Sequence, residues 1–287
     1  MEPGYNDLME TGMIDKTILI TGASDGIGKQ CAIQLAGLGA WVFVHGRNAA
    51  KTQDACDEVI ALSGNPRVET IIADLRSLHQ VQALANQVRE RTRRLDVLIN
   101  NAGIFMNKRR LTDDGLETTF EVNYLAHFYL TNLLMDLLKD STPSRVINVS
   151  SVGHKLVYLN LRDLQGKYFF WNWVAYCRSK LLNLMFTFEL AERLKGSGVV
   201  ANAVHPGVIS TNVLKNARIL SNMTPEDGAR SIVQLASSPE LETVTGKYFD
   251  RFRPGKASPL ARKVDLRKKI WDLSWQLCST AVSSSRS

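Results

Sequence analysis

The chain has 287 residues, of which 45% are hydrophobic and 22% are charged, as is typical of a globular protein. Lys and Arg outnumber Asp and Glu by 35 to 28, which gives a net charge of +7. No long block of Lys and Arg is present, so nucleic acid is excluded as a predicted partner.

The cysteine, histidine and apolar patterns exclude further classes. The four cysteines form no CxxC pair and the five histidines show no ligand spacing, so neither a metal site nor a disulfide framework is predicted. No run of about 18 apolar residues exists, and the N-terminal segment lacks the pattern of a secretory signal. A cytoplasmic protein is expected, with peripheral membrane contact left open.

Short apolar runs rich in β-branched residues alternate with longer helical patterns along the chain. Strands are expected at 16–21, 41–46, 68–74, 95–100, 145–150, 199–206 and 246–250, and helices at 26–39, 49–63, 78–92, near 115–138 and near 173–195. Such strands, separated by helices, predict a parallel sheet covered on both faces. The expected fold class is α/β: a single doubly wound Rossmann domain with a mainly parallel seven-stranded sheet and helices on both faces.

No internal repeat and no linker rich in Gly or Pro divides the chain. One domain is therefore predicted over 1–287. Its core covers about 15–250, and 251–287 forms a C-terminal helix and a flexible tail.

A glycine-rich turn, "TGASDGIGK" at 21–29, follows the first expected strand and opens the first helix. Small residues there allow a backbone to approach a pyrophosphate, which then rests on the helix N-terminus. The GK[ST] ending of a P-loop is missing, so a dinucleotide is favoured, with a simple tight turn as the alternative. The predicted cofactor contacts in this turn are Gly22, Ser24, Gly26, Ile27 and Gly28.

The tip of the second strand indicates which dinucleotide is bound. It carries Gly46 and Arg47, without the carboxylate that would accept the ribose 2′-hydroxyl of NAD. A guanidinium grips a 2′-phosphate, so Arg47 predicts NADP(H), with Lys29 as an assistant. Asp25, an acid inside the turn, opposes this preference, and a solvated loop arginine is the alternative.

Tyr176 lies four residues before Lys180, so both fall on one face of the helix expected near 173–195. The pair gains meaning from motifs that occur in order along the chain. These are "TGASDGIG" (21–28), "ADL" (73–75), "NNAG" (100–103), Asn123, "NVSS" (148–151), "YCRSK" (176–180) and "HPG" (205–207). Over about 15–250 the chain resembles the short-chain dehydrogenase/reductase family. Through "LRDLQGKYF", "AYCRSKLLNLMFTFELAERLKGSGV" and "RKKIWDLSWQL", it looks most like the retinol dehydrogenase branch.

The resemblance implies a role for each matching residue. Tyr176 is the proton donor or acceptor for the substrate oxygen, Lys180 lowers the pKa of Tyr176 and holds the nicotinamide ribose, and Ser151 hydrogen-bonds the substrate oxygen. Asn123 supports a proton relay near the lysine. The remaining cofactor contacts implied by the resemblance are Asp74, Leu75, Asn101, Ala102, Gly103, Pro206, Gly207, Val208 and Thr211.

The chemistry of carbonyl reduction agrees with these roles. Negative charge develops on the carbonyl oxygen, so a proton donor must lie within hydrogen-bond reach. A free phenol has a pKa near about 10, which a nearby ammonium and an oxidised nicotinamide lower. Ser151 follows the end of a central strand, where ligands bind in open α/β sheets.

The expected function is an NADP(H)-dependent oxidoreductase that transfers a hydride between nicotinamide and a hydrophobic alcohol, aldehyde or ketone. Retinoid-like, steroid-like and lipid-derived substrates are all compatible. One alternative is a catalytically idle NADPH-binding scaffold or redox sensor. A serine hydrolase built on Ser151 and His154 is disfavoured, because the GxSxG elbow is missing.

Three segments bear on the substrate and on partners. Ser151 and Tyr176 are 25 residues apart, and the segment between them includes an aromatic-rich stretch that either walls an apolar pocket or packs against the sheet edge. The stretch 208–224 is the expected second wall. The C-terminal helix around Trp271 and Trp275 either packs on its own domain or touches the pocket or a membrane. The helices near 115–138 and 173–195 suit the homodimer contact usual in the family, but a buried face of a monomer would look similar.

Overall fold

The computed structural model describes residues 12–209, 221 and 223–284. Its strands form one sheet in the order β3-β2-β1-β4-β5-β6-β7-β8, parallel except for the last pair. They are β1 (Thr17–Ile20), β2 (Trp41–Gly46), β3 (Val68–Ile72), β4 (Val97–Asn100), β5 (Ser144–Val149), β6 (Val199–His205), β7 (Tyr248–Asp250) and β8 (Arg253–Pro254). The doubly wound α/β fold is confirmed, with eight strands instead of the predicted seven. The additional strand, β8, has two residues, too few for a hydrophobic period to reveal.

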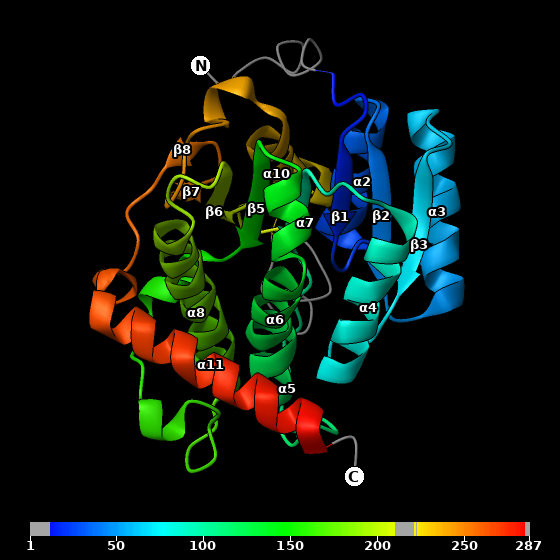
Figure 1. Ribbon diagram of the computed structural model, residues 1–287. Helices are drawn as coiled ribbons and strands as arrows, with labels where there is room; N and C mark the ends of the chain where they lie inside the picture. The colour runs from blue at the N-terminus through cyan, green and yellow to red at the C-terminus, as the bar shows by residue number, and fades with distance from the viewer. Residues whose placement is uncertain (1–11, 210–220, 222, 285–287) are drawn as a thin grey trace.

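Helices cover both faces of this sheet, as Figure 1 shows. They are α2 (Gly26–Gly37), α3 (Ala49–Ser63), α4 (Leu78–Arg91), α5 (Thr118–Phe120), the π-helix η1 (Glu121–Leu125), α6 (Ala126–Leu133), α7 (Met135–Asp140), α8 (Asn172–Arg193), α10 (Pro225–Ser237) and α11 (Val264–Ser284). Short 3₁₀ turns are η2 (Val152–Lys155), η3 (Leu161–Asp163), η4 (Pro239–Leu241) and η5 (Pro259–Arg262).

The alternation of side chains along β1 explains the two layers. Ile18 and Ile20 join the apolar cluster that includes α2 and α10, whereas Leu19 joins the cluster on the opposite face with α4, α6 and α8. Because the strand order reverses between β1 and β4, the carboxyl ends of these two strands form the crevice where ligands bind in such sheets.

The helix expected near 115–138 is not continuous. It begins at Thr118, loosens into the π-helix η1 around Asn123, and is interrupted again between α6 and α7. The helix α10 was absent from the predicted elements, although Thr224 and Asp227 form a capping box and Pro225 occupies the first turn. These residues are a start signal for a helix that can be recognised in the sequence.

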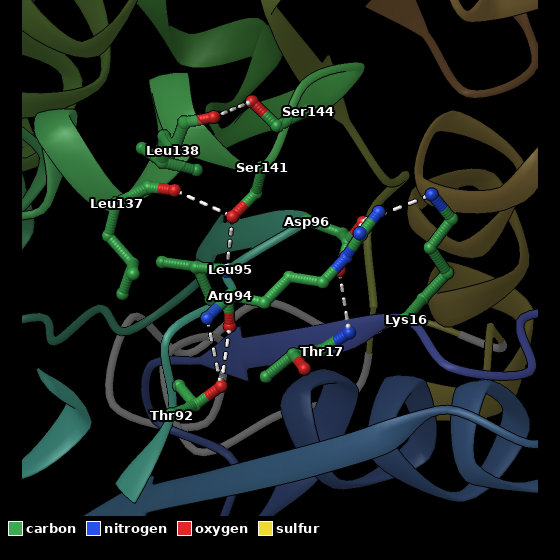
Figure 2. Close-up of polar contacts among 10 residues, drawn as sticks. All are labelled: Lys16, Thr17, Thr92, Arg94, Leu95, Asp96, Leu137, Leu138, Ser141 and Ser144. Carbon is green, nitrogen blue, oxygen red and sulfur yellow. Dashed lines mark hydrogen bonds and ion pairs between the residues drawn. The ribbon is translucent and has the colours of Figure 1, made fainter. Parts of the chain in front are cut away.

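Hydrogen bonds tie the sheet together at the amino ends of β1, β4 and β5, as Figure 2 shows. The Asp96 carboxylate is 2% exposed, accepts from the backbone N–H of Thr17 at 3.0 Å, and pairs with Lys16 and Arg94. Ser141 Oγ accepts from Leu95 N at 2.8 Å. These polar contacts lie at the opposite edge from the crevice and have a structural role.

The C-terminal helix α11 lies across α8 and α6 (Figure 1). The Trp271 ring lies 4.9 Å from the Phe128 ring and 5.9 Å from the Phe186 ring, and Ser274 Oγ lies 2.7 Å from Tyr124 Oη. The helix therefore packs on its own domain, which was one of the two predicted alternatives. The predicted flexible tail covers 283–287; Ser283 and Ser284 belong to α11, and 285–287 lie outside the described residues. Within the described ranges, no helix combines the length and apolar character needed to cross a bilayer.

Candidate active site

The glycine-rich turn between β1 and α2 is shaped by contacts that leave no room for side chains. Gly22 and Gly26 have φ values of 64° and 56°, in the left-handed region. A Cβ on Gly22 would lie 2.8 Å from Ala102 Cα, and one on Gly28 would lie 2.4 Å from Gly22 O. The turn is thus a bare backbone surface at the N-terminus of α2, which fits a pyrophosphate.

Two side chains from neighbouring strands hold this turn. Asn101 Nδ2 donates to the carbonyls of Thr21 at 2.9 Å and Gly22 at 3.1 Å. His45 Nδ1 accepts from Gly22 N at 3.1 Å, so its Nε2 donates to Ala73 O at 3.0 Å. Burial lowers the pKa of His45 to about 4, which keeps this imidazole neutral. No motif in the sequence indicates this role for His45.

The rim beyond the turn carries the predicted Arg47 and a second cation. Ser24 lies beside the end of β2, since a Cβ on Gly46 would lie 3.1 Å from its Oγ. The Lys51 ammonium is 2.6 Å from the Asp25 carboxylate, and hydrogen bonding to Lys51 contributes most to lowering the pKa of Asp25. The predicted assistant Lys29 instead pairs with Glu58 at 2.7 Å. Lys51 was overlooked, although it lies four residues after Arg47.

Asp74 and Leu75 follow β3 on the same edge of the sheet. Burial acts to raise the pKa of Asp74, but hydrogen bonds from Arg76 and the charge of Arg47 outweigh it and lower the value. The backbone N–H of Asp74 donates to Gln80 Oε1 at 2.8 Å. Asp74 is therefore a half-buried carboxylate that is held by Gln80 and Arg76, and the positive charge of Arg47 stabilises its ionised form.

Tyr176, Lys180 and Ser151 converge at the carboxyl end of β5. Tyr176 and Lys180 lie one turn apart on α8, with Lys180 Nζ 5.7 Å from the centre of the Tyr176 ring. Lys180 Nζ donates to Val149 O at 3.0 Å, and Ser150 Oγ donates to Lys180 O at 2.9 Å. Ser151 lies next to the Tyr176 phenol, since its side chain acts to lower the pKa of that group.

Burial dominates the electrostatics of this group. It raises the pKa of Tyr176 to about 12 against the opposing effect of the Ser151 hydrogen bond, and lowers the pKa of Lys180 to about 8. The expected lowering of the tyrosine pKa by the ammonium is thus outweighed in this structure by the cost of burying a phenolate. Both groups are pushed toward their neutral forms.

Asn123 lies in the π-helix η1 and joins two sides of the site. Its Oδ1 accepts from Ile104 N at 2.8 Å, and its Nδ2 donates to Ile104 O at 3.0 Å and to Ser179 Oγ at 3.1 Å. A Cβ on Gly103 would lie 3.5 Å from Lys180 Nζ and 3.8 Å from Asn123 Oδ1. The predicted residues of β4, η1 and α8 therefore lie within a few ångströms of one another.

A buried histidine connects this group to the glycine-rich turn. His127 Nε2 lies 3.0 Å from Thr21 Oγ1, and His127 Nδ1 lies 3.2 Å from the Asn123 carbonyl. Thr21 Oγ1 in turn accepts from Asn101 N at 2.9 Å. Burial lowers the pKa of His127 to about 3, so it is a neutral link between the two halves of the site. The sequence pattern did not mark it.

The segment after β6 forms the far side of the crevice. Pro206 is buried, Gly207 has a φ of 109°, and Val208 is 41% exposed. A Cβ on Gly207 would lie 2.7 Å from Met223 Cε, so this turn has no room for another side chain. Thr211 and most of the expected second wall lie outside the described residues.

The aromatic-rich stretch before α8 divides into an inner and an outer part. Trp173 contacts Phe105 at 5.1 Å and Tyr176 at 6.3 Å between ring centres, so these rings form an apolar wall beside the phenol. In contrast, Tyr158 is 93% exposed and Phe169 66% exposed. The stretch was expected either to wall a pocket or to pack against the sheet edge. Neither expectation describes all of it, because Trp173 packs beside Tyr176 whereas Tyr158 and Phe169 face solvent.

The arrangement around Ser151 does not support a hydrolase. His154 Nδ1 lies 2.6 Å from the backbone carbonyl of Ser151, and Ser151 Oγ accepts from Gly153 N at 3.2 Å. The imidazole therefore hydrogen-bonds the backbone carbonyl of Ser151, whereas the base of a catalytic triad must receive the proton of the serine hydroxyl.

Comparisons with known proteins agree with this geometry. The family model for short chain dehydrogenase matches residues 16–220. Retinol dehydrogenase 14 of Homo sapiens is 40% identical over 91% of this chain and 86% of its own length. An uncharacterized protein from Mycobacterium paratuberculosis has a similar crystal structure, with a TM-score of 0.79 and 34% identity over 93% of this chain and 95% of that chain.

A second solved structure, the RhlG/NADP active-site complex of Pseudomonas aeruginosa, has a TM-score of 0.69 and 26% identity, covering 84% of this chain and 96% of that chain. The family match and the identity over nine-tenths of the chain confirm the resemblance predicted from the motifs. The chain belongs to the short-chain dehydrogenase/reductase family of nicotinamide-dependent oxidoreductases, in its retinol dehydrogenase branch.

Proposed function

We propose that the protein is an NADP(H)-dependent oxidoreductase that interconverts hydrophobic alcohols with the corresponding aldehydes or ketones. The observation that carries this proposal is the convergence of Ser151, Tyr176 and Lys180 near the glycine-rich turn. An idle scaffold would need only the turn. The polar group around Tyr176 supports turnover.

The cofactor would be held along the carboxyl edge of the sheet. The bare backbone of Gly22, Gly26 and Gly28 suits the pyrophosphate, with Ser24 and Ile27 beside it. Asp74 and Leu75 would flank the adenine, and the backbone of 101–103 with Pro206, Gly207 and Val208 would border the nicotinamide. Thr211 remains a prediction from the resemblance alone.

Preference for NADP(H) over NAD(H) rests on the charges at the end of β2. Arg47 is exposed, and Lys51 lies at the start of α3 close to Asp25. The Lys51 ammonium offsets the Asp25 carboxylate, which otherwise would repel a 2′-phosphate. The NADP complex of the RhlG relative supports the same preference.

The reaction follows from the properties of the buried groups. When bound, the nicotinamide supplies or accepts the hydride. Tyr176, whose pKa is raised to about 12, is held as the protonated phenol that can donate to a carbonyl oxygen. Ser151 would donate a second hydrogen bond to that oxygen, and Lys180 and Asn123 would hold the ribose side and the proton relay.

The substrate is proposed to be apolar, because Phe105 and Trp173 border Tyr176 with aromatic surface. Relatives named retinol dehydrogenase favour a retinoid-like substrate. Steroid-like and lipid-derived carbonyl compounds have the same apolar character and remain in the proposed class.

The subunit arrangement is proposed from the position of α11. Trp271 and Trp275 contact Phe128 on α6, which is the face that a four-helix dimer would require. We propose that α11 occupies this face in place of a second subunit. We also propose that the whole chain forms one domain.

The test follows the absorbance of NADPH and of NADH with purified protein and a panel of retinal, a steroid ketone and a long-chain aldehyde. Oxidation that is faster with NADPH supports both the reaction and the cofactor preference. Oxidation that is faster with NADH contradicts the role of Arg47 and Lys51. Tight NADPH binding without turnover of any panel member favours the scaffold.

A further inference from the structure

The segment between β5 and α8 presents a concentration of exposed apolar side chains. We call the set Leu156, Tyr158, Leu161, Tyr168, Phe169 and Trp171 the insert patch. Their exposed fractions range from 38% for Leu161 to 93% for Tyr158. Six large apolar side chains exposed within one segment of 16 residues are unusual for a surface and are typical of a contact site. Figure 1 shows the segment, drawn in green, reaching below α11.

The insert patch is held in place by bonds at its base. Arg178 Nη1 donates to the carbonyls of Asp163 and Leu164, both at 2.8 Å. The Asp163 carboxylate accepts from the backbone of Tyr168 at 3.2 Å and of Phe169 at 3.1 Å. These contacts fix the turn that carries the two aromatic rings, so their exposure is a built feature of the fold.

A second set of bonds joins this base to the opposite side of the site. Glu117 N donates to Gln165 Oε1 at 2.8 Å, and Arg109 Nε donates to Gln165 O at 3.2 Å. Trp171 immediately precedes α8, and Trp173 packs on Tyr176. The insert patch is therefore continuous in sequence with the inner aromatic wall of the candidate active site.

The exposed charged side chains of the segment are all positive. Its exposed ionic side chains are Lys155, Arg162 and Lys167, whereas its one carboxylate, Asp163, is 9% exposed and bonded inward. A hollow of about 460 Å³ beside Leu161 continues toward the start of α11, where Lys263 and Lys269 add two cations and Asp265 one anion. The surroundings of the apolar surface are thus net positive.

Apolar and aromatic side chains among cations fit the interface of an anionic phospholipid membrane. Tyr and Trp settle at the headgroup level, and Lys and Arg are attracted to anionic lipids. The apolar face of α11 cannot serve this purpose, because Trp271 is packed against Phe128 and Phe186. We infer that the insert patch docks the protein on an anionic lipid surface, which would open the Tyr176 site toward a bilayer that dissolves its substrate.

This inference deepens the proposed function, since it supplies the route by which an apolar substrate reaches Tyr176. Its test needs neither cofactor nor turnover. The full chain is sedimented with vesicles of phosphatidylcholine and phosphatidylserine, and in parallel with vesicles of phosphatidylcholine alone. Binding to the anionic vesicles that weakens as salt is added supports the inference. Equal or absent binding to both vesicle types contradicts it.

The matched variants locate the contact. The triple variant Tyr158→Ser, Phe169→Ser, Trp171→Ser is expected to bind anionic vesicles at least about tenfold more weakly. The control, Ile14→Ser with Leu62→Ser, removes side chains that are 70% and 64% exposed elsewhere and should bind as the parent does. Circular dichroism and the thermal midpoint verify that each variant is folded.

The variant Lys155→Gln, Arg162→Gln, Lys167→Gln tests the electrostatic part. Each cation near an anionic surface contributes about fivefold in affinity, so a loss of about a hundredfold is expected. Unchanged vesicle binding in the serine and glutamine variants would overturn the inference.

A concentration-dependent dimer that the serine variant abolishes would also overturn it, because the insert patch would then bind a second copy of the chain. Vesicle binding without turnover would leave the docking surface standing and count against the proposed reaction alone.

Discussion

The Lys51 ammonium lies 2.6 Å from the Asp25 carboxylate and joins the first turn of α3 to the glycine-rich turn. Asp25 also accepts from Gly26 N at 2.7 Å, so the acid caps α2 while its charge is offset by Lys51. An acidic residue inside the glycine turn therefore does not by itself oppose a 2′-phosphate. We therefore expect the proposed cofactor preference to depend on Arg47, Lys51 and Asp25 together and not on Arg47 alone.

Replacing Arg47 and Lys51 together by Gln is expected to reverse the cofactor preference. The KM for NADPH should rise by about ten- to a hundredfold, because a charge-assisted hydrogen bond contributes about 1.5–3 kcal/mol. The KM for NADH should change little. Steady-state kinetics with both cofactors measures this, and Lys29→Gln is the matched control, since Lys29 pairs with Glu58. Equal loss for NADPH and NADH would refute the assignment.

Lys180→Met is expected to abolish turnover while stabilising the folded protein. Folding lowers the pKa of Lys180 from 10.5 to about 8, so the buried ammonium costs stability below about pH 8. That cost disappears as the pH rises from about 8 to 10.5, where the folded state has already released the proton. The Val149 carbonyl keeps a bond from Asn183 Nδ2 at 3.3 Å after the substitution.

Urea unfolding at several pH values measures this prediction. The variant should exceed the parent by about 1–3 kcal/mol at pH 7, with the difference shrinking toward pH 10.5. A variant that is less stable than the parent at pH 7 would show that the Lys180 bond to Val149 outweighs the burial of its charge.

Asn123→Ala removes three hydrogen bonds that join η1 to Ile104 and Ser179. At about 0.5–1.5 kcal/mol for each bond, the free energy of unfolding should fall by about 2–4 kcal/mol. Asn132→Ala on α6 is the control, because Asn132 Nδ2 makes one bond, to Phe128 O at 2.7 Å. Urea titration of both variants gives the comparison, and equal losses would mean that the π-helix does not depend on Asn123.

Trp271→Ala is expected to destabilise the protein by about 3–5 kcal/mol, as for a large aromatic residue removed from a core. Trp271 is 8% exposed and also lies 4.3 Å from the Arg193 guanidinium. Trp275→Ala, at 36% exposed, should cost less stability, and urea unfolding of both variants gives the comparison.

Light scattering should show a monomer for the parent protein. A stable dimer that persists with α11 intact would contradict the proposed covering of α6 and α8.

Most of the sheet could be predicted from the sequence, because strands such as β1, β4 and β6 are short, largely apolar and buried along their whole length. The run at 41–46, for example, matches β2 residue for residue. The glycine turn could also be predicted, because its glycine spacing directly follows an apolar strand, although the contacts that exclude a Cβ at Gly22 come from Ala102.

Other features depend on partners distant in sequence. The break in the helix near 115–138 depends on bonds from Asn123 to Ile104 and Ser179, which no local period encodes. His45 and His127 acquire their positions only when β2 and α6 meet the glycine turn. The strand β8 exists because two residues pair with β7. Each of these required the tertiary structure.

The proposed exchange of a proton between Tyr176 and the substrate oxygen can be measured with the variant Tyr176→Phe. Retinal reduction with NADPH is followed by absorbance for the parent, for Tyr176→Phe and for Tyr248→Phe, a buried tyrosine whose hydroxyl has no hydrogen-bond partner among the described residues. We expect kcat to fall by about a hundred- to ten-thousandfold for Tyr176→Phe and to change little for Tyr248→Phe. Parent-like turnover in Tyr176→Phe would contradict it.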